Sequence, residues 1–446
     1  MKLGLFGIGR SNLGVYEYLS RRMSIDELTL RSDTAIPDEI VATLQPNRVF
    51  VGERALFDVY EDALFLSPSA RRDRPELKAA AERGVTLTSD LELYLEKRGG
   101  IDVAVTGSDG KSTTTYLLAD ALTRSGKRAM AVGNFGVPLS SVIDEDAMTV
   151  AELSSFQLMY ASPKARTAVI TNIVPNHLNW HKDLDEYVGA KLNILSSAER
   201  TVINADDKIS SEVLSGHPVF AAVSTALPYG ELRLHLSAEH YLTYRCGTVY
   251  LDGVPYLDVS EAKRREAYNV KNYMLTAAAL IGECGPEAIR AAVLDFCGLP
   301  HRAELVGELD GKVYLDSSVD STPERTLNTL RGIRGDIAVI IAGRGKRLSL
   351  YPLAEELPRL TVGCVLMGEI GEELCPILSR TNADYPFIKV KDMASAVRAA
   401  SELISGSGTV VLSPAGTSFD SYKNFEERGR DFRRAAERFI NENKGL

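Results

Sequence analysis

The chain lacks the features of a disulfide-linked, zinc-bound or membrane-spanning protein. Its 446 residues include five cysteines, an odd number with no Cys-x-x-Cys spacing. Neither a disulfide framework nor a zinc module is therefore expected, and we interpret the thiols as reduced core residues. No apolar run approaches the roughly 18 residues of a membrane helix, and the segment that starts at Met1 is too short in apolar residues for a signal peptide. These absences predict a soluble, cytoplasmic protein without a membrane partner.

Positive charge is also in short supply. Fifty-one Lys and Arg against sixty Asp and Glu give a net charge of -9, which argues against nucleic acid as a partner. A composition of 45% hydrophobic and 25% charged residues is typical of globular proteins and excludes a disordered or low-complexity chain. Because one domain usually takes roughly 150 residues, we expect two or three domains.

A unit of strand, glycine turn and helix opens the chain. The apolar segment Lys2–Phe6 precedes the turn, and a helical pattern runs from Leu13 to about Arg21. Short apolar segments that alternate with a helix at Pro75–Arg83 then predict a Rossmann-like sheet. The dinucleotide fingerprint needs a glycine where Asn12 stands and an acid where Arg31 stands, so NAD binding is not favoured.

Two further α/β blocks follow. The second starts after a break at residues 97–100, and its strand-like pattern between about Glu231 and Val259 predicts antiparallel hairpins attached to the main sheet. The third starts near Gly298, and continuous apolar segments such as Ile337–Ala342 are typical of a parallel sheet covered on both faces. We therefore predict an α/β protein of three domains: a Rossmann-like domain at 1–97, a P-loop ATPase-like domain with attached hairpins at 98–297, and a second Rossmann-like domain at 298–446.

A glycine-rich turn between a strand and a helix predicts a phosphate-binding loop. Such a turn points backbone N–H groups at an anion near the positive end of a helix. Lys111 would reach the outer phosphates and Ser112 would give its hydroxyl to Mg²⁺. Val105 stands where the full pattern has its first glycine, so the flanking strand and helix are what favour nucleotide binding over an unrelated turn. The loop residues are Gly107, Ser108, Asp109, Gly110, Lys111, Ser112 and Thr113.

Three more side chains are candidates for chemistry. Glu152 follows an apolar strand directly and is a candidate metal ligand, or else a solvated acid at a strand end. His177 lies in a loop after another strand, where it would bind metal or phosphate or serve a structural role. Lys191 falls on the apolar face of the helix at Leu184–Leu195, so its amine is paired, deprotonated or modified, or extends to solvent from the edge of the core.

Taken in order, these segments resemble the motifs of the Mur ligases over nearly the whole chain, and most closely those of the branch that adds D-glutamate. The matching segments are 106–113, 152–158, the His177 loop with 187–191, 268–272, 299–302 and 412–429. The resemblance implies that a carboxylate of UDP-N-acetylmuramoyl-L-alanine takes the γ-phosphate of ATP, and that the amine of D-glutamate then captures the acyl phosphate. It also implies two Mg²⁺ ions, which offset charge on the oxygens.

The resemblance assigns roles residue by residue. Lys111 and Ser112 would act on the phosphates and Mg²⁺, while Glu152, His177 and a carbamylated Lys191 would hold metal. The residues expected at the nucleotide are Asn269, Asn272, Arg302 and Asp316, those expected at the muramoyl precursor are Ser11, Asn12, Ser32, Asn134 and Ser155, and those expected at D-glutamate are Lys346, Ser418 and Phe425.

Some positions depart from the family pattern. Asn176 and Asn179 stand where the family has acids, and a lysine of the family is missing near Val319, where Asp316 is expected to serve in place of the usual acid. Two alternatives stay open: another Mur-type or folylpolyglutamate-type ligase, and a nucleotide-binding relative without turnover. We expect a monomer, and we expect Phe432 and Phe439 of the last helix to pack in the core.

Overall fold

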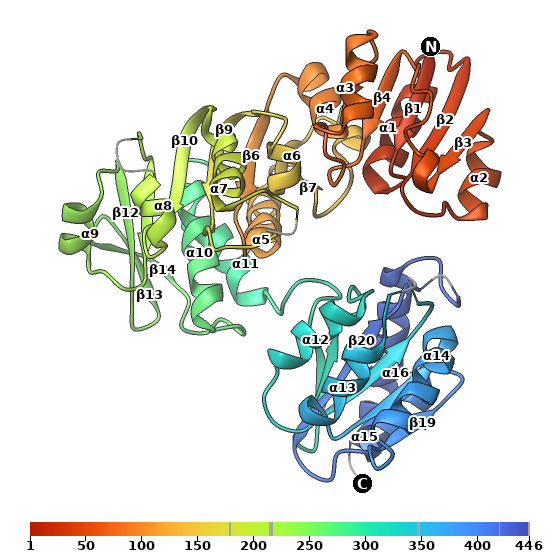
Figure 1. The fold of residues 1–446 in the computed structure, drawn as a ribbon. Helices are drawn as coiled ribbons and strands as arrows, with labels where there is room; N and C mark the ends of the chain where they lie inside the picture. The colour runs from red at the N-terminus through yellow and green to blue at the C-terminus, as the bar shows by residue number, and fades with distance from the viewer. Residues whose placement is uncertain (178–179, 214–216, 346–347, 419, 445–446) are drawn as a thin grey trace. The chain divides into compact units, whose positions relative to one another are not determined.

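The computed structural model describes the chain except for residues 178–179, 214–216, 346–347, 419 and 445–446. It divides into two compact units, Met1–Phe296 and Cys297–Leu446. Both units combine helices with sheets in which parallel pairing predominates, so the predicted α/β class is confirmed (Figure 1). The three domain boundaries at 1–97, 98–297 and 298–446 stay predictions. No helix in the described part of the chain is both long and apolar enough to span a membrane.

The first unit begins with a fully parallel five-stranded sheet. Its strands lie in the order β3 (Arg48–Val51), β2 (Glu27–Ser32), β1 (Lys2–Phe6), β4 (Ala63–Leu66) and β5 (Thr86–Thr88). Its helices are α1 (Arg10–Ser20), α2 (Asp38–Leu44), α3 (Pro75–Glu82) and α4 (Asp90–Arg98). Helix α1 begins three residues before the predicted Leu13, so Ser11 and Asn12 belong to its first turn and not to the glycine turn.

A nine-stranded sheet forms the rest of the first unit. Its order is β14 (Val254–Asp258), β13 (Thr248–Leu251), β12 (His240–Arg245), β11 (Ala221–Ser224), β10 (Ser197–Asn204), β9 (Lys164–Ile170), β6 (Ile101–Thr106), β8 (Met148–Glu152) and β7 (Ala129–Gly133). Strands β12, β13 and β14 pair antiparallel, which confirms the predicted hairpins from His240 on. The strand-like pattern predicted from about Glu231 was wrong at its start, where Tyr229–His235 form a helix. Strands β7 and β11 were not predicted, although the sequence has short apolar runs at residues 129–132 and 219–223.

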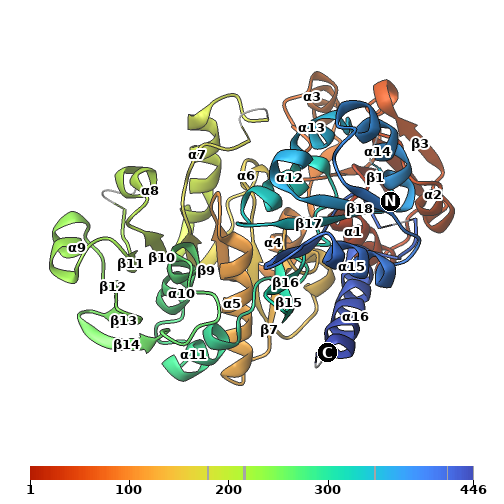
Figure 2. The ribbon, with the colours of Figure 1, turned by 90° about the horizontal axis from the view of Figure 1, so that it is seen from below.

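Three helices of this unit pack together beside the sheet. Helix α5 (Lys111–Arg124) contacts both α10 (Ala267–Ala279) and α11 (Pro286–Asp295), and the three lie side by side in Figure 2. The short helix α6 (Ser155–Leu158) contacts α7 (Leu184–Leu192). The smaller elements are the helices α8 (Lys208–Val213) and α9 (Tyr229–His235) and the 3-10 turns η1 (Gly52–Arg54), η2 (Leu139–Val142) and η3 (Asn193–Leu195).

The second unit is a six-stranded sheet with helices α12 to α16. The strand order is β15 (Glu304–Leu309), β16 (Lys312–Asp316), β20 (Gly408–Ala415), β17 (Ile337–Ala342), β18 (Gly363–Met367) and β19 (Phe387–Lys389). The strands from β16 to β19 in this order are all parallel, as predicted, whereas β15 was not predicted and pairs antiparallel at the edge. The helices are α12 (Pro323–Arg331), α13 (Tyr351–Leu360), α14 (Gly368–Thr381), α15 (Met393–Glu402) and α16 (Phe425–Asn443).

The prediction that phenylalanines of the last helix lie in the core is confirmed, whereas the same prediction for the cysteines is mostly wrong. Phe432 of α16 is fully buried and Phe439 packs against the same cluster, as the sequence predicts. All five cysteines carry free thiols, but Cys364 alone is buried and Cys246 is exposed. The interpretation of the cysteines as core residues was therefore wrong for most of them.

Candidate active site

The loop between β6 and α5 has the backbone of a phosphate-binding turn. Gly107 and Gly110 have φ angles of 149° and 80°, in the left-handed region that favours glycine. A Cβ on Gly107 would clash with the Thr171 hydroxyl, and one on Gly110 would clash with the Asn272 side-chain oxygen. Gly110 precedes the first turn of α5 and provides no side-chain cap. The start of α5 therefore offers backbone N–H groups to an anion.

Lys111 folds back over this loop. Its Nζ donates hydrogen bonds to the carbonyl oxygens of Gly107 and Ser108, both at 2.9 Å. Ser112 is buried and Thr113 half-buried in the next positions of the helix. The Asp109 backbone N–H donates to a side-chain oxygen at 3.0 Å, that of Asn172, a residue that sequence reasoning did not single out.

Lys191 also reaches the loop, from helix α7. Its side chain is 2% exposed and its Nζ donates to the Gly107 carbonyl oxygen at 2.6 Å. Burial, followed by repulsion from the Lys111 charge, lowers the pKa of Lys191 to about 6. The amine is then mostly neutral at neutral pH. From the same helix, the Tyr187 hydroxyl lies 2.6 Å from that of Ser108.

Glu152 has a carboxylate oxygen that invites a cation. The residue ends β8 and is 1% exposed. Its Oε1 accepts a hydrogen bond of 2.6 Å from Asn134 Nδ2, while its Oε2 is buried without a hydrogen-bond partner among the described residues. A buried carboxylate oxygen that is left unpaired is costly, and a hard cation such as Mg²⁺ is a ligand that satisfies it. The residues present therefore fit a divalent ion.

The two histidines of the loop before α7 differ in their surroundings. His177 is exposed, with a φ of 55° and its ring centroid 5.0 Å from that of Phe156. His181 is 2% exposed, and its Nε2 lies 2.9 Å from the Ser155 hydroxyl oxygen. Sequence reasoning selected His177 and passed over His181. The sequence did contain a signal for His181, because this residue follows the chain's one tryptophan, Trp180, and tryptophan is usually largely buried.

The two asparagines of α10 are both buried but serve different neighbours. Asn272 lies against Gly110, and the Thr114 hydroxyl donates to its side-chain oxygen at 3.4 Å. Asn269 donates from Nδ2 to Glu266 at 2.9 Å. Asn272 therefore lies at the glycine loop before α5. Asn269 instead contacts Glu266, the residue that precedes α10.

In the five-stranded sheet, the predicted residues make contacts within the sheet and its loops. Asn12 is 1% exposed, and its Nδ2 donates to the carbonyl oxygens of Phe6, Gly7 and Phe65 at 2.8–3.1 Å. Ser32 is buried and accepts from the Thr34 backbone N–H at 3.2 Å. Ser11 is half-buried in the first turn of α1. Asn12 therefore has a structural role at the ends of β1 and β4.

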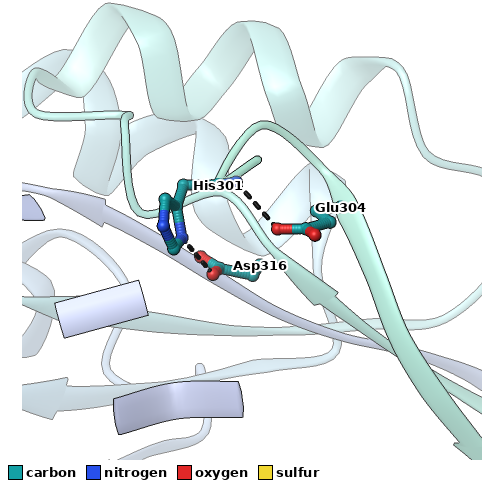
Figure 3. A group of neighbouring side chains, drawn as sticks. All are labelled: His301, Glu304 and Asp316. Atoms are coloured by element: carbon teal, nitrogen blue, oxygen red, sulfur yellow. Dashed lines mark hydrogen bonds and ion pairs between the residues drawn. The ribbon is translucent and has the colours of Figure 1, made fainter. Parts of the chain in front are cut away.

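In the second unit, Asp316 is part of a closed cluster (Figure 3). Its Oδ2 lies 2.7 Å from His301 Nδ1, and its Oδ1 accepts from the Ser318 backbone N–H at 2.9 Å. The third member, Glu304, accepts from the His301 backbone N–H at 2.9 Å and pairs with Arg433. Because these donors already occupy the acidic side chains, we do not interpret the cluster as a metal site.

The other predicted residues of this unit lie near its strand ends and at the start of α16. Arg302 lines a pocket with Asp320 and Arg325. Ser418 is buried, and the ring of Phe425 lies edge-on to that of His301 at 6.0 Å. The lining of the pocket is completed by Val319, Asn328 and Thr329. Lys346 lies outside the described residues.

Known proteins resemble this chain in sequence and in fold. Residues 105–244, which contain the phosphate loop, Glu152 and Lys191, match the family model described as Mur ligase middle domain. Proteins named UDP-N-acetylmuramoylalanine–D-glutamate ligase match nearly the whole chain. Those of Acetivibrio thermocellus and Clostridium kluyveri are each 33% identical to it, over 97% of this chain and 95% of their own length.

Solved structures show the same fold. A UDP-N-acetylmuramate–alanine ligase from Thermotoga maritima matches with a TM-score of 0.56 and 19% identity, over 99% of this chain and 100% of that one. A murein peptide ligase from Psychrobacter arcticus matches with a TM-score of 0.51 and 17% identity, over 98% of each chain. By its identity to the curated relatives over nearly its full length, the chain belongs to the Mur ligase family, within the group of UDP-N-acetylmuramoylalanine–D-glutamate ligases.

Proposed function

We propose that this protein uses ATP to add D-glutamate to UDP-N-acetylmuramoyl-L-alanine during peptidoglycan precursor synthesis. One observation carries the proposal: a buried, mostly neutral lysine, Lys191, and the loop lysine, Lys111, both bond to the carbonyl of Gly107. A glycine-rich loop at the start of a helix, with the Lys111 ammonium beside it, is a site for phosphates, and a neutral Lys191 amine next to that loop can be modified. The names of the curated relatives supply the substrates.

The reaction has to convert a carboxylate into an acyl donor. The precursor carboxylate attacks the γ-phosphate of ATP, an O–P bond forms, and ADP leaves with the electrons of the broken bond. The amine of D-glutamate then attacks the acyl carbon, loses its proton and displaces inorganic phosphate. Lys111 and the first N–H groups of α5 would stabilise the phosphate charge that shifts in the first step.

Divalent cations would be held by Ser112, Glu152, His177 and Lys191, and the charge they supply would offset that of the phosphate oxygens. A neutral amine reacts with CO₂, forming an N–C bond and giving a proton to solvent. Lys191 is proposed to carry this carbamate, which turns a buried amine into an anionic ligand. The low pKa of Lys191 supports the proposal, because a protonated amine has no lone pair to offer.

The other predicted contacts remain part of the proposal. Asn269, Asn272, Arg302 and Asp316 would serve the nucleotide, Ser11, Asn12, Ser32, Asn134 and Ser155 the precursor, and Lys346, Ser418 and Phe425 D-glutamate. The three bonds from the Asn12 amide to backbone carbonyls support a structural role for that residue more than a direct one. We also propose that the protein acts as a monomer in the cytoplasm, where ATP and UDP-linked precursors are available.

The test is phosphate release by the purified protein. Release should require ATP, UDP-N-acetylmuramoyl-L-alanine and an amino acid together, and D-glutamate should be the amino acid that supports it from a panel including L-glutamate, L-alanine and a diamino acid. Release with a folate acceptor would support the folylpolyglutamate-type alternative. ATP binding without release under any combination would support a relative without turnover.

Lys111→Ala should lower kcat by about 10²–10³-fold, the range seen when one donor to a developing charge is removed. Lys127→Ala is the control, because Lys127 pairs with Glu283 at 3.0 Å and has no proposed role in the reaction. Full activity in Lys111→Ala would contradict the assignment of the phosphate loop.

A further inference from the structure

Four polar side chains contact one another in series between the loop after β4 and the start of α6. The series begins at Arg71, whose guanidinium donates to both carboxylate oxygens of Glu186 on α7, at 3.0 and 3.1 Å. The same guanidinium donates to the Trp180 carbonyl at 2.7 Å and to Asp73 at 2.8 Å. With the two further bonds from its Nε to Asp73, these six donor contacts fix Arg71 and, through it, the Glu186 carboxylate.

His181 is the next side chain in this series of contacts. Glu186 Oε2 lies 3.3 Å from His181 Nδ1, and the opposite ring nitrogen, Nε2, lies 2.9 Å from the Ser155 hydroxyl oxygen. The Nδ1 contact is long and its geometry falls short of a hydrogen bond, so we treat it as electrostatic. The Ser155 hydroxyl is thus connected, through the His181 ring, to the Glu186 carboxylate that Arg71 holds in place.

The carboxylate determines which ring nitrogen carries the proton. A neutral imidazole has one N–H, and a carboxylate beside Nδ1 favours the proton there. With the proton on Nδ1, Nε2 is an acceptor and the Ser155 O–H must donate to it. Ser155 is 2% exposed, and among the described residues no other group donates to its hydroxyl oxygen, so the lone pairs of that oxygen are left for a donor on a ligand.

We propose that Arg71, Glu186 and His181 are positioning residues that orient the Ser155 hydroxyl as a hydrogen-bond acceptor for an N–H or O–H group of the UDP-linked precursor. The inference rests on the proposed function and extends it to a group of residues that act through Ser155. It also links the two sheets of the first unit, because Arg71 follows β4 whereas Tyr187 and Lys191, on the helix of Glu186, contact the phosphate loop.

The test compares KM values in single variants. Arg71→Met and Glu186→Gln should each raise KM for the precursor by about three- to tenfold, the value of one neutral hydrogen bond, with smaller changes in kcat and in KM for ATP. Arg72→Met is the matched control. Arg72 also pairs with a glutamate, Glu92, and stacks on an aromatic ring, that of Tyr160, and its side chain has the same 19% exposure as that of Arg71.

A double variant separates positioning from general stability. In a Ser155→Ala background, Arg71→Met should raise KM for the precursor no further, because the hydroxyl that it orients is gone. His181→Gln, which retains an oxygen acceptor, should recover most of the activity that His181→Leu loses. A further rise in KM in the Ser155→Ala background, or equal loss in both His181 variants, would overturn the inference.

A second readout does not depend on turnover. Nitrogen-15 chemical shifts of the His181 ring should show the proton on Nδ1 in the wild-type protein and a larger share on Nε2 in Glu186→Gln. A wild-type ring protonated on Nε2 would refute the positioning chain even if the ligase assay succeeds. Absence of joint substrate dependence in the wild-type assay, with the proton on Nδ1, would instead count against the proposed function.

Discussion

At the scale of single residues, three buried cations have different surroundings. Arg428 is fully buried and donates to the carbonyl oxygens of Ala342, Gly416 and Ser318 and to the Ser318 hydroxyl. Burial lowers its pKa to about 10, so it stays charged at neutral pH. Arg31 has a carboxylate partner, Glu61, at 2.7 Å. Lys191 has one carbonyl acceptor and a pKa of about 6. Burial is the first cause of both shifts, but the Arg428 guanidinium starts from a higher pKa than the Lys191 amine and therefore keeps its proton at neutral pH.

Arg31→Met should destabilise the first unit by about 3–5 kcal/mol, because it leaves the buried Glu61 carboxylate without its partner. The side chains of both residues are at most 1% exposed. Urea unfolding gives the measurement. The double variant Arg31→Met/Glu61→Leu should recover much of the loss, since it removes the unpaired charge. A single variant as stable as the wild type would contradict this account.

Asp320→Asn should stabilise the second unit more at neutral pH than in acid. Burial raises the pKa of Asp320 above the ordinary 3.8, against the hydrogen bonds of Ser317, Thr329 and Ser413. The unfolded chain therefore loses this proton at lower pH than the folded protein, and the free energy of unfolding falls as pH rises from about 4 through the raised pKa. Melting temperatures of variant and wild type should diverge between about pH 4 and pH 7. A constant difference would count against a raised pKa.

At the scale of elements, the strands and the glycine loop could be predicted while their pairing could not. The bounds predicted for β1, Lys2–Phe6, and for β17, Ile337–Ala342, agree with the structure residue for residue. Each is a short apolar run bounded by polar or turn residues. The antiparallel edge strand β15 was missed, because its residues are half-exposed and carry no continuous apolar run. The local composition of a segment indicates whether it is buried. Whether two neighbouring strands run parallel or antiparallel depends instead on the segment that connects them.

Gly110→Ala should lower affinity for ATP by at least about tenfold, because alanine is strained at a φ of 80° and its Cβ would clash with Asn272. Gly126, beyond the other end of α5, is the matched control. It has a φ of 85°, and a Cβ there would meet open space. Calorimetric titration with ATP measures the difference. Equal affinities in the two variants would show that the Asn272 contact has no influence on the loop.

At the scale of the whole molecule, the chain consists of two compact units, each with its own hydrophobic cores. The one tryptophan, Trp180, lies in the first unit with its ring centroid 4.4 Å from that of Phe156. Its fluorescence therefore reports on the first unit, while circular dichroism reports on both. Because units with separate cores can unfold separately, multidomain chains commonly depart from two-state unfolding.

Unfolding followed by the two methods should give different midpoints. Arg31→Met should shift the fluorescence transition, whereas Arg428→Met in the second unit should shift the circular dichroism curve and leave the fluorescence midpoint nearly unchanged. Coincident shifts in both signals for both variants would indicate that the two units unfold as one.

The sequence by itself determined the α/β class, most strand positions, the glycine-rich turn before α5 and the buried lysine of α7. These follow from local patterns of apolar residues and glycine, which act within a few positions of one another. Only the tertiary structure decided that Arg71 holds Glu186, that His181 and not His177 meets Ser155, and that Asn12 ties together strand ends. Such contacts join side chains that are distant along the chain, and their hydrogen-bond geometry exists only once the strands have taken their order in the sheet.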